Sequence, residues 1–443
     1  MGYSEVSCQI CAVRFNVARL RTRDEPVEAG WGFSSSLHYA GDPTSAICSL
    51  HPEQSGCDED VRGEPDDDVL HFPGRYCTYE GGYNGWKIGA DEMKGMRLPR
   101  YIVQKPANRD DSDEDQEEYE RSSDFFVTSQ TTRVPFDADF GGPLAKVRFE
   151  VDFLFPQNYL VMKPTDGFNC GVPVHDQCWK IFERVSKLRM GKVDLQGFMA
   201  LWDRQACSGC GFEGINSEPM LPKCKSDHWQ HLPGSEYLAA NPLDIPGLMI
   251  QLYSFYLTQP SGISMLSERP PHRDNAMDKF GRLPKELTMM ILQHLSSKDI
   301  ASLRLVTRSF RYLPKKAFLG LIKKELPWFW EYDEFEEFMQ KTHNGYQKLW
   351  DRDLGESNPI NWYVLYNQLR LAKTKLLGLK NRVRIWNVAE EITRRIQKLR
   401  DEIGEGEDLP VGITEDEKER GVKQPGFSCI KCDYTLRPKM VNY

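Results

Sequence analysis

The spacing of apolar residues changes partway along the chain. In residues 1–258, short apolar segments lie between Gly, Pro and aromatic residues. The alternation over 146–155 predicts a strand, and the spacing over 178–190 predicts a helix. From residue 284 to about 403, apolar residues recur with the helical period. The pattern predicts an α+β protein in which an irregular N-terminal region with a few strands precedes a helical region.

Shifts in composition divide these regions further. Residues 259–279 include Pro260, Pro270 and Pro271 and few apolar side chains, which is typical of a linker. The predicted organisation is therefore an N-terminal region containing Cys and His (1–258), a linker (259–279), a motif of short helices (280–325), a C-terminal helical region (326–403) and a charged tail with Cys429 and Cys432 (404–443).

The net charge of −8 comes from two acidic runs. Residues 58–68 carry seven acids against one arginine, and residues 110–120 carry eight acids and no base. Like charges repel and resist burial, so we expect disordered loops at about 58–68 and 108–122. Neither the whole chain nor its remainder has the basic excess of a nucleic-acid-binding protein, and we expect no nucleic-acid partner.

The chain lacks the signals of a membrane or secreted protein. No apolar run approaches the roughly 18 residues of a membrane-spanning helix. The first residues, MGYSEVSCQIC, have neither a basic segment nor an apolar one, so we expect a cytoplasmic or nuclear location and no membrane partner. The 12 cysteines should then be reduced, as thiols or metal ligands.

Residues 283–314, LPKELTMMILQHLSSKDIASLRLVTRSFRYLP, predict three short helices. Pro284 lies in the first turn, where its missing N–H costs nothing. Ser296 followed by Asp299 predicts a capping box at the start of the second helix, and 306–313 predicts the third. Helices this short cannot bury such wide apolar faces among themselves, so we expect a partner or neighbouring segment to cover them.

These residues resemble the F-box. Its pattern opens with Leu-Pro, an acid and Leu, and continues with Ile-Leu, Leu, Asp-Leu, Leu-Arg and Val. Thr307 and Phe310 depart from it, standing where the family often has Cys and Trp, but both keep size or apolar character. The matching residues are Leu283, Pro284, Glu286, Leu287, Ile291, Leu292, Leu295, Asp299, Ile300, Leu303, Arg304 and Val306.

The resemblance implies a non-catalytic subunit that docks on the Skp-type adaptor of an SCF-type cullin–RING ubiquitin ligase and recruits an unidentified protein client. Segments 236–248, 327–331 and 376–386 also look like F-box proteins of filamentous fungi. The competing interpretation, an ordinary amphipathic hairpin, accounts less well for the joint occurrence of these motifs. The implied contact residues are Leu283, Pro284, Leu287, Ile291, Leu292, Leu295, Ile300, Leu303 and Val306.

Cysteine pairs indicate a structural zinc site in the N-terminal region. Cys8 and Cys11 have the Cys-x-x-Cys spacing that lets two thiolates reach one Zn²⁺, and His175 with Cys178 supplies a matching His-x-x-Cys. The long intervening loop is tolerable because closure entropy rises slowly with length. The alternative is that the pair is idle and the thiols are ordinary small apolar side chains.

The ligands of a second site are harder to pair. Cys207 and Cys210 are predicted to join Cys224 and His228, with His231 as an alternative ligand. They could instead meet Cys429 and Cys432 across the helical region. Regularly spaced RING ligands, nucleotide-binding loops and hydrolase motifs are absent, so we assign no catalytic group and no required cofactor. The alternative to a ligase subunit is a zinc-stabilised interaction scaffold in an adaptor-only complex that transfers no ubiquitin.

Overall fold

The computed structural model divides the chain into two compact units. Unit 1 comprises Met1–Asp244 and Asn381–Tyr443, and unit 2 comprises Ile245–Lys380. The structure describes residues 7–32, 37–39, 48–61, 68–105, 117–130, 153–154, 169–206, 211–225, 229–257, 279–307, 309–310, 313, 315–350 and 362–403. Among these residues, no helix is long and apolar enough to cross a membrane.

The main sheet of unit 1 is antiparallel and has the strand order β10–β6–β7. It is formed by Pro99–Gln104 (β6), Phe125–Val127 (β7) and Val172–His175 (β10). Ile102 is opposite Val172 on one side and Val127 on the other. The buried positions of β6 include Tyr101, Ile102 and Val103, so this strand is central to the core as well as to the sheet.

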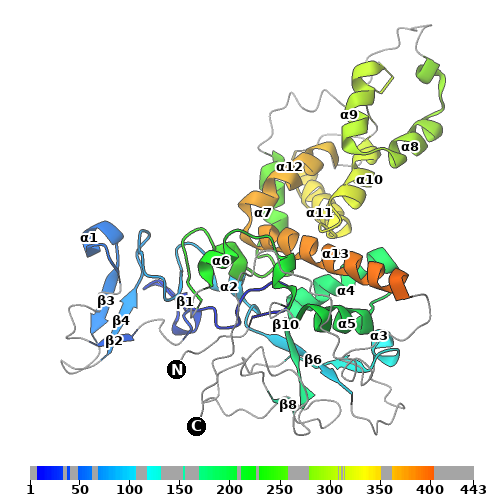
Figure 1. Cartoon of the computed structure of the whole chain (residues 1–443). Coiled ribbons are helices and arrows are strands. Elements are labelled where there is room, and N and C mark those ends of the chain that lie inside the picture. Colours follow the sequence, from blue (N-terminus) through cyan, green and yellow to red (C-terminus); the bar gives the residue numbers. More distant parts are fainter. Residues whose placement is uncertain are drawn as a thin grey trace, which may run out of the picture. The chain divides into compact units, whose positions relative to one another are not determined.

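Three smaller sheets complete the strands of unit 1 (Figure 1). One is antiparallel with the order β2–β4–β3, and two are parallel pairs, β1–β5 and β8–β9. Their bounds are Arg19–Leu20 (β1), Leu37–Tyr39 (β2), Asp58–Val61 (β3), Asp68–Phe72 (β4), Tyr83–Asn84 (β5), Phe153–Leu154 (β8) and Asn169–Cys170 (β9).

Helices α4 (Asp176–Met190) and α5 (Leu195–Ala206) supply the aromatic core of unit 1. The predicted helix at 178–190 is therefore confirmed, and it starts two residues earlier. Trp179, Phe182 and Phe198 are fully buried, with Phe198 edge-on to both other rings. Edge-to-face packing of this kind adds to the burial of apolar area and anchors α4 beside β10.

The remaining helices of unit 1 are short, apart from the one that ends the described chain. They are α1 (Pro52–Ser55), α2 (Ala90–Met93), α3 (Glu118–Arg121), α6 (Leu221–Cys224) and α13 (Leu377–Ile403), whose residues from Asn381 onward belong to unit 1, with 3₁₀ turns at Val27–Ala29, Gly211–Ile215 and Glu236–Ala239. The apolar repeat of 388–399 is buried along α13, as its helical spacing predicts.

Unit 2 is helical. Its core is formed where α12 packs against α10 and α7. Phe318 on α10 lies against the rings of Tyr363 and Tyr366 on α12. The helices are α7 (Leu248–Leu257), α8 (Lys285–His294), α9 (Ser297–Val306), α10 (Lys315–Glu325), α11 (Tyr332–Trp350) and α12 (Trp362–Lys375), with a 3₁₀ turn at Lys279–Arg282.

The structure corrects several predicted boundaries. Residues 245–257 belong to unit 2 and residues 381–403 to unit 1, whereas the sequence grouped each with its neighbours along the chain. The sequence predicted the third helix of the 280–325 motif over 306–313. In the structure α9 ends at Val306, the chain then turns, and the next helix begins at Lys315. Residues 258–278 of the predicted linker and 404–443 of the predicted tail lie outside the described residues.

The acidic runs are partly ordered, which corrects the expectation of two disordered loops. Residues 58–61 form strand β3, which pairs with β4 through its backbone. Residues 118–121 form α3, where Glu120 is fully buried and accepts a hydrogen bond from the Val127 amide at 2.9 Å. Residues 62–67 and 106–116 lie outside the described residues.

Candidate docking face and buried Cys/His cluster

The local sequence determines where helices α8 and α9 begin. Pro284 is the N-cap of α8, and its carbonyl accepts the Thr288 N–H at 3.1 Å. The predicted capping box of α9 is confirmed: the Asp299 N–H donates to Ser296 Oγ at 3.2 Å, and the Ser296 N–H donates to Asp299 Oδ2 at 3.3 Å. The hydroxyl and N–H of Ser296 hold the pKa of Asp299 below its usual value.

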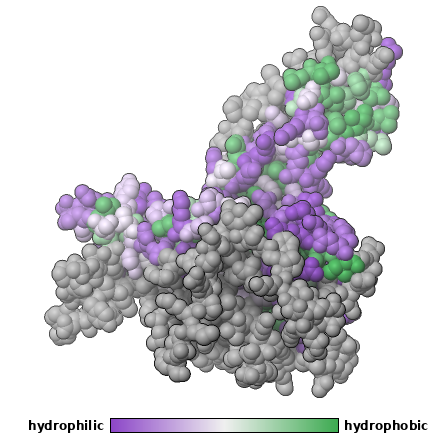
Figure 2. Space-filling model, in the orientation of Figure 1, coloured by the Kyte–Doolittle hydropathy of each residue, from purple (hydrophilic) through white to green (hydrophobic). Residues whose placement is uncertain are grey.

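Large apolar side chains on α8 and α9 are exposed in the described part of the chain. Leu287 is 45% exposed, Met290 57%, Leu305 89% and Val306 83%. Figure 2 shows hydrophobic surface over these two helices. Single exposed apolar side chains are ordinary on protein surfaces, but several large ones on neighbouring helices make this face a candidate interaction site.

The structure sorts the predicted contact residues into two groups. Leu292 and Ile300 are each 3% exposed and pack inside unit 2, so in this structure they support the helices from within. Met290 and Leu305 are exposed members that the list omitted, although each lies beside a listed apolar residue. The listed residues that remain accessible are Leu283, Pro284, Leu287, Ile291, Leu295, Leu303 and Val306.

Polar contacts fix α9 against the helices behind it. Glu325 on α10 accepts hydrogen bonds from the Ser297 N–H at 2.6 Å and from the Tyr366 hydroxyl at 2.6 Å. Burial alone would raise the pKa of Glu325, but these donors outweigh it and lower the pKa. Lys324 Nζ donates to the carbonyl of His294 at 3.2 Å, at the C-terminus of α8. Hydrogen bonds to α10 therefore hold in place the two helices that carry the exposed apolar side chains.

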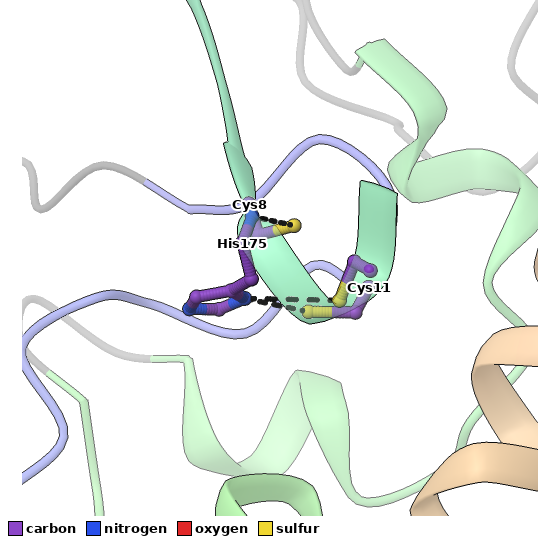
Figure 3. Close-up of side chains that lie close together, drawn as sticks. Cys8, Cys11 and His175 are labelled. Carbon is purple, nitrogen blue, oxygen red and sulfur yellow. Dashed lines mark hydrogen bonds between the residues drawn. The ribbon is translucent and has the colours of Figure 1, made fainter. Parts of the chain in front are cut away.

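In unit 1, Cys8, Cys11, His175 and Cys178 come together, in the pairing that the sequence predicted. All four are fully buried, and their ligand atoms lie within 4.8 Å of one another. His175 Nδ1 lies 3.3 Å from Cys11 Sγ (Figure 3). The same nitrogen lies 3.9 Å from Cys178 Sγ.

The backbone around each pair turns the side chains inward. The Cys8 N–H donates to the Val13 carbonyl at 2.9 Å, and the Ala12 N–H donates to the Cys8 carbonyl at 2.8 Å. Ala12 has φ +62°, a left-handed conformation that closes this turn. His175 ends β10 and is the N-cap of α4, which places Cys178 in the first helical turn. The His175 N–H donates to Cys8 Sγ at 3.2 Å and links the two pairs.

Buried side chains support the turn that carries Cys11. Its carbonyl accepts hydrogen bonds from Asn216 Nδ2 at 2.9 Å and Arg384 Nη1 at 2.8 Å. Arg384 also donates to Asn381 Oδ1, and Asn381 donates to the Ala240 carbonyl at 2.7 Å.

The sequence predicts that residues 380–384 form a small basic patch that neutralises nearby acids or faces solvent. The structure instead buries Asn381, Arg382 and Arg384, because backbone carbonyls supply their partners.

Burial and close contact shift the pKa values of Cys11, His175 and Cys178. Burial opposes ionisation of Cys11, but hydrogen bonds from Cys178 and Cys8 and the charge of His175 lower its pKa well below the usual value. Burial also opposes the imidazolium, yet the Cys8 and Cys11 thiolates raise the pKa of His175 to about 10. Burial and the neighbouring thiols raise the pKa of Cys178. The Cys11 thiolate is therefore favoured, whereas the Cys178 thiolate would need a cation at the centre of the cluster to stabilise it.

The donor set and spacing fit zinc. In a tetrahedral Zn²⁺ site, bond lengths of about 2.3 Å to sulfur and 2.0–2.1 Å to nitrogen put neighbouring ligand atoms roughly 3.6–3.8 Å apart. The two distances from His175 Nδ1 lie on either side of this value. Three cysteines and one histidine form a set found in structural zinc sites.

The second predicted ligand set is not assembled in the described residues. Cys207, Cys210 and His228 lie outside them, as do Cys429 and Cys432, and Cys224 is buried. The alternative ligand His231 is committed to hydrogen bonds: the Ala18 N–H donates to its Nε2 at 2.8 Å, and Nδ1 lies 2.8 Å from the Glu80 carbonyl oxygen. His231 therefore serves as a structural cross-link in this fold.

Comparison with protein families identifies one segment. Residues 280–318 match the F-box domain, so the chain contains an F-box domain that includes α8, α9 and the start of α10. No curated protein and no solved structure matches the chain.

Proposed function

We propose that this F-box-containing chain is a non-catalytic substrate receptor of an SCF-type cullin–RING ubiquitin ligase. An F-box domain suggests an adaptor-type role, typically in such ligases. The observation that carries the proposal is the apolar face of α8 and α9, where Leu287, Met290, Leu305 and Val306 are exposed. Burial of this face against a Skp-type adaptor would remove its exposed apolar surface from water.

The proposed mechanism is proximity. A receptor that holds a client near a charged ubiquitin-conjugating enzyme raises the effective concentration of the client's lysines and needs no reactive group of its own. The client is a protein whose identity is open, and the parts of the chain outside the F-box are the proposed client-binding region.

Co-purification with a Skp-type adaptor tests the proposal. Leu305→Glu places a charge in the proposed interface, and Leu371→Glu on α12 is the matched control because Leu371 is also an exposed helical leucine, 52% exposed. We expect wild type and Leu371→Glu to retain the adaptor and Leu305→Glu to lose it, with equal circular dichroism. Retention of the adaptor by Leu305→Glu would overturn the assigned face.

Ubiquitin transfer separates the receptor from the adaptor-only scaffold. A client captured by proximity labelling should be ubiquitinated by the reconstituted ligase with wild type and not with Leu305→Glu. A stable adaptor complex that excludes the cullin would favour the scaffold.

We also propose that Cys8, Cys11, His175 and Cys178 hold one structural Zn²⁺. The fit of the donor set and the burial of all four ligands support this assignment. The ion would join the turn at residues 8–11 to the junction of β10 and α4. Metal analysis of wild type and Cys178→Ser tests it, with the loss of one zinc per chain expected.

A further inference from the structure

A second group of cysteines lies in unit 1, in a segment without any Cys-x-x-Cys pair. The Sγ atoms of Cys48, Cys57 and Cys77 lie within 4.8 Å of one another. His71 is 2% exposed, and its Nε2 lies 3.3 Å from Cys77 Sγ. Three sulfur atoms therefore converge within 30 residues of sequence, and one imidazole nitrogen lies beside the sulfur of Cys77.

Two turns in close contact bring these side chains together. The first follows α1, where Gly56 has φ +69° and precedes Cys57. The second follows β4, where a Cβ on Gly74 would lie 2.1 Å from the Ser55 carbonyl oxygen, so only glycine permits this approach. The Tyr76 N–H donates to that same carbonyl at 3.2 Å, which positions Cys77 beside the first turn.

One thiol already accepts a backbone hydrogen bond. The Gly74 N–H donates to Cys57 Sγ at 3.4 Å. This contact links the Cys57 side chain to the second turn, which carries Cys77.

Few buried apolar side chains are found in the described part of this segment. Among residues 48–80 whose side chains are described, Phe72 and Pro73 are the large apolar side chains that are buried. The guanidinium groups of Arg21 and Arg23 lie over the Phe72 ring, at 4.7 Å and 5.8 Å from the centroid. Small folded segments that lack a core are commonly stabilised by disulfides or metal ions.

We propose that Cys48, Cys57, His71 and Cys77 bind a second structural Zn²⁺, which fastens the β2–β4–β3 sheet. The 3.3 Å between His71 Nε2 and Cys77 Sγ is close to the roughly 3.6 Å edge of a tetrahedral site with these two ligands. The cysteines are half-buried, so the ion can enter from solvent, whereas the imidazole approaches from the buried side.

Metal content of the full chain tests the proposal. We compare wild type, Cys77→Ser, His71→Asn and His51→Asn by mass spectrometry of bound metals after purification without chelator. His51 is the matched control because it is an exposed histidine in the same segment. We expect Cys77→Ser to hold one zinc fewer per chain than wild type, His71→Asn to bind this zinc at least tenfold more weakly, and His51→Asn to equal wild type.

Cobalt substitution adds a readout that misfolding does not mimic. Co²⁺ bound by thiolates gives sulfur-to-metal charge-transfer absorption, and His71→Asn should alter the ligand-field bands while retaining the thiolate absorption. Equal zinc content in wild type and Cys77→Ser would overturn the proposal. A chain that holds no zinc here and is lighter by two hydrogen atoms, with Cys57 joined to Cys77, would also overturn it and assign a disulfide.

Discussion

Loss of the first zinc site should loosen a specific part of unit 1. The perturbation is Cys178→Ser, which removes one of four ligands in the cluster and changes little in volume. Cys11 and His175 are separated by 164 residues. A cross-link that closes a loop of this length restricts the unfolded chain by about 5 kcal/mol at 25 °C in the chain-entropy description.

That magnitude is large for a single substitution. A domain is typically stable by about 5–15 kcal/mol, so unit 1 would lose a third or more of its margin. Because about 1.4 kcal/mol corresponds to a tenfold change in an equilibrium constant, the amides of β10 and α4 should exchange roughly 10³- to 10⁴-fold faster.

Hydrogen exchange read by mass spectrometry is the assay, because it reports β10 and α4 separately from unit 2. Ser186→Ala on α4 is the control: Ser186 is fully buried and donates one hydrogen bond to the Lys192 carbonyl at 2.9 Å. Loss of this hydrogen bond should lower the free energy of unfolding by about 1 kcal/mol. A metal chelator should accelerate exchange of β10 and α4 in wild type and Ser186→Ala but add nothing at these two elements in Cys178→Ser.

Equal exchange of wild type with and without chelator would refute the zinc assignment. A loss in Cys178→Ser no larger than that of Ser186→Ala would refute the loop-closure magnitude.

Three further outcomes follow from the described contacts. Leu292→Ala should destabilise unit 2 by about 2–5 kcal/mol because it empties a buried position, and thermal melting should reveal this loss. Arg384→Met should leave the Cys11 carbonyl with one donor fewer and lower the melting temperature of unit 1, while zinc content is retained. The folded-state pKa of Glu325 is lowered, so its contribution to the free energy of unfolding is complete above the ordinary glutamate pKa and is lost as the pH falls through the lowered value. Glu325→Gln should therefore flatten the acid-side dependence of stability on pH, measured by unfolding the F-box helices at a series of pH values.

Features that depend on neighbouring residues were predictable from the sequence. The capping box of Ser296 and Asp299 needs only four consecutive residues, and it forms as predicted. The pairing of Cys8 and Cys11 with His175 and Cys178 was also predictable despite their separation, because each half has the spacing of a zinc ligand pair and the donor sets are complementary.

Features that depend on distant partners were not predictable. The basic residues of 380–384 look solvent-exposed in sequence, yet Arg384 is buried because the Cys11 carbonyl and Asn381 supply its hydrogen bonds. Asp58–Val61 looks like a charged loop, yet it pairs with β4. The Cys48, Cys57 and Cys77 group has irregular spacing and becomes visible only when the two turns meet.

The burial of the first cluster distinguishes a structural metal site from a catalytic one. A catalytic zinc needs an open coordination position that a substrate or water can reach, whereas a structural zinc has four protein ligands. Cys8, Cys11, His175 and Cys178 supply four ligands, and none is accessible to solvent. An ion there has no position left for chemistry. The apolar side chains of α8 and α9 are, by contrast, exposed and accessible to another protein, which agrees with the proposed receptor, in which the proposed metal ions would have a structural role.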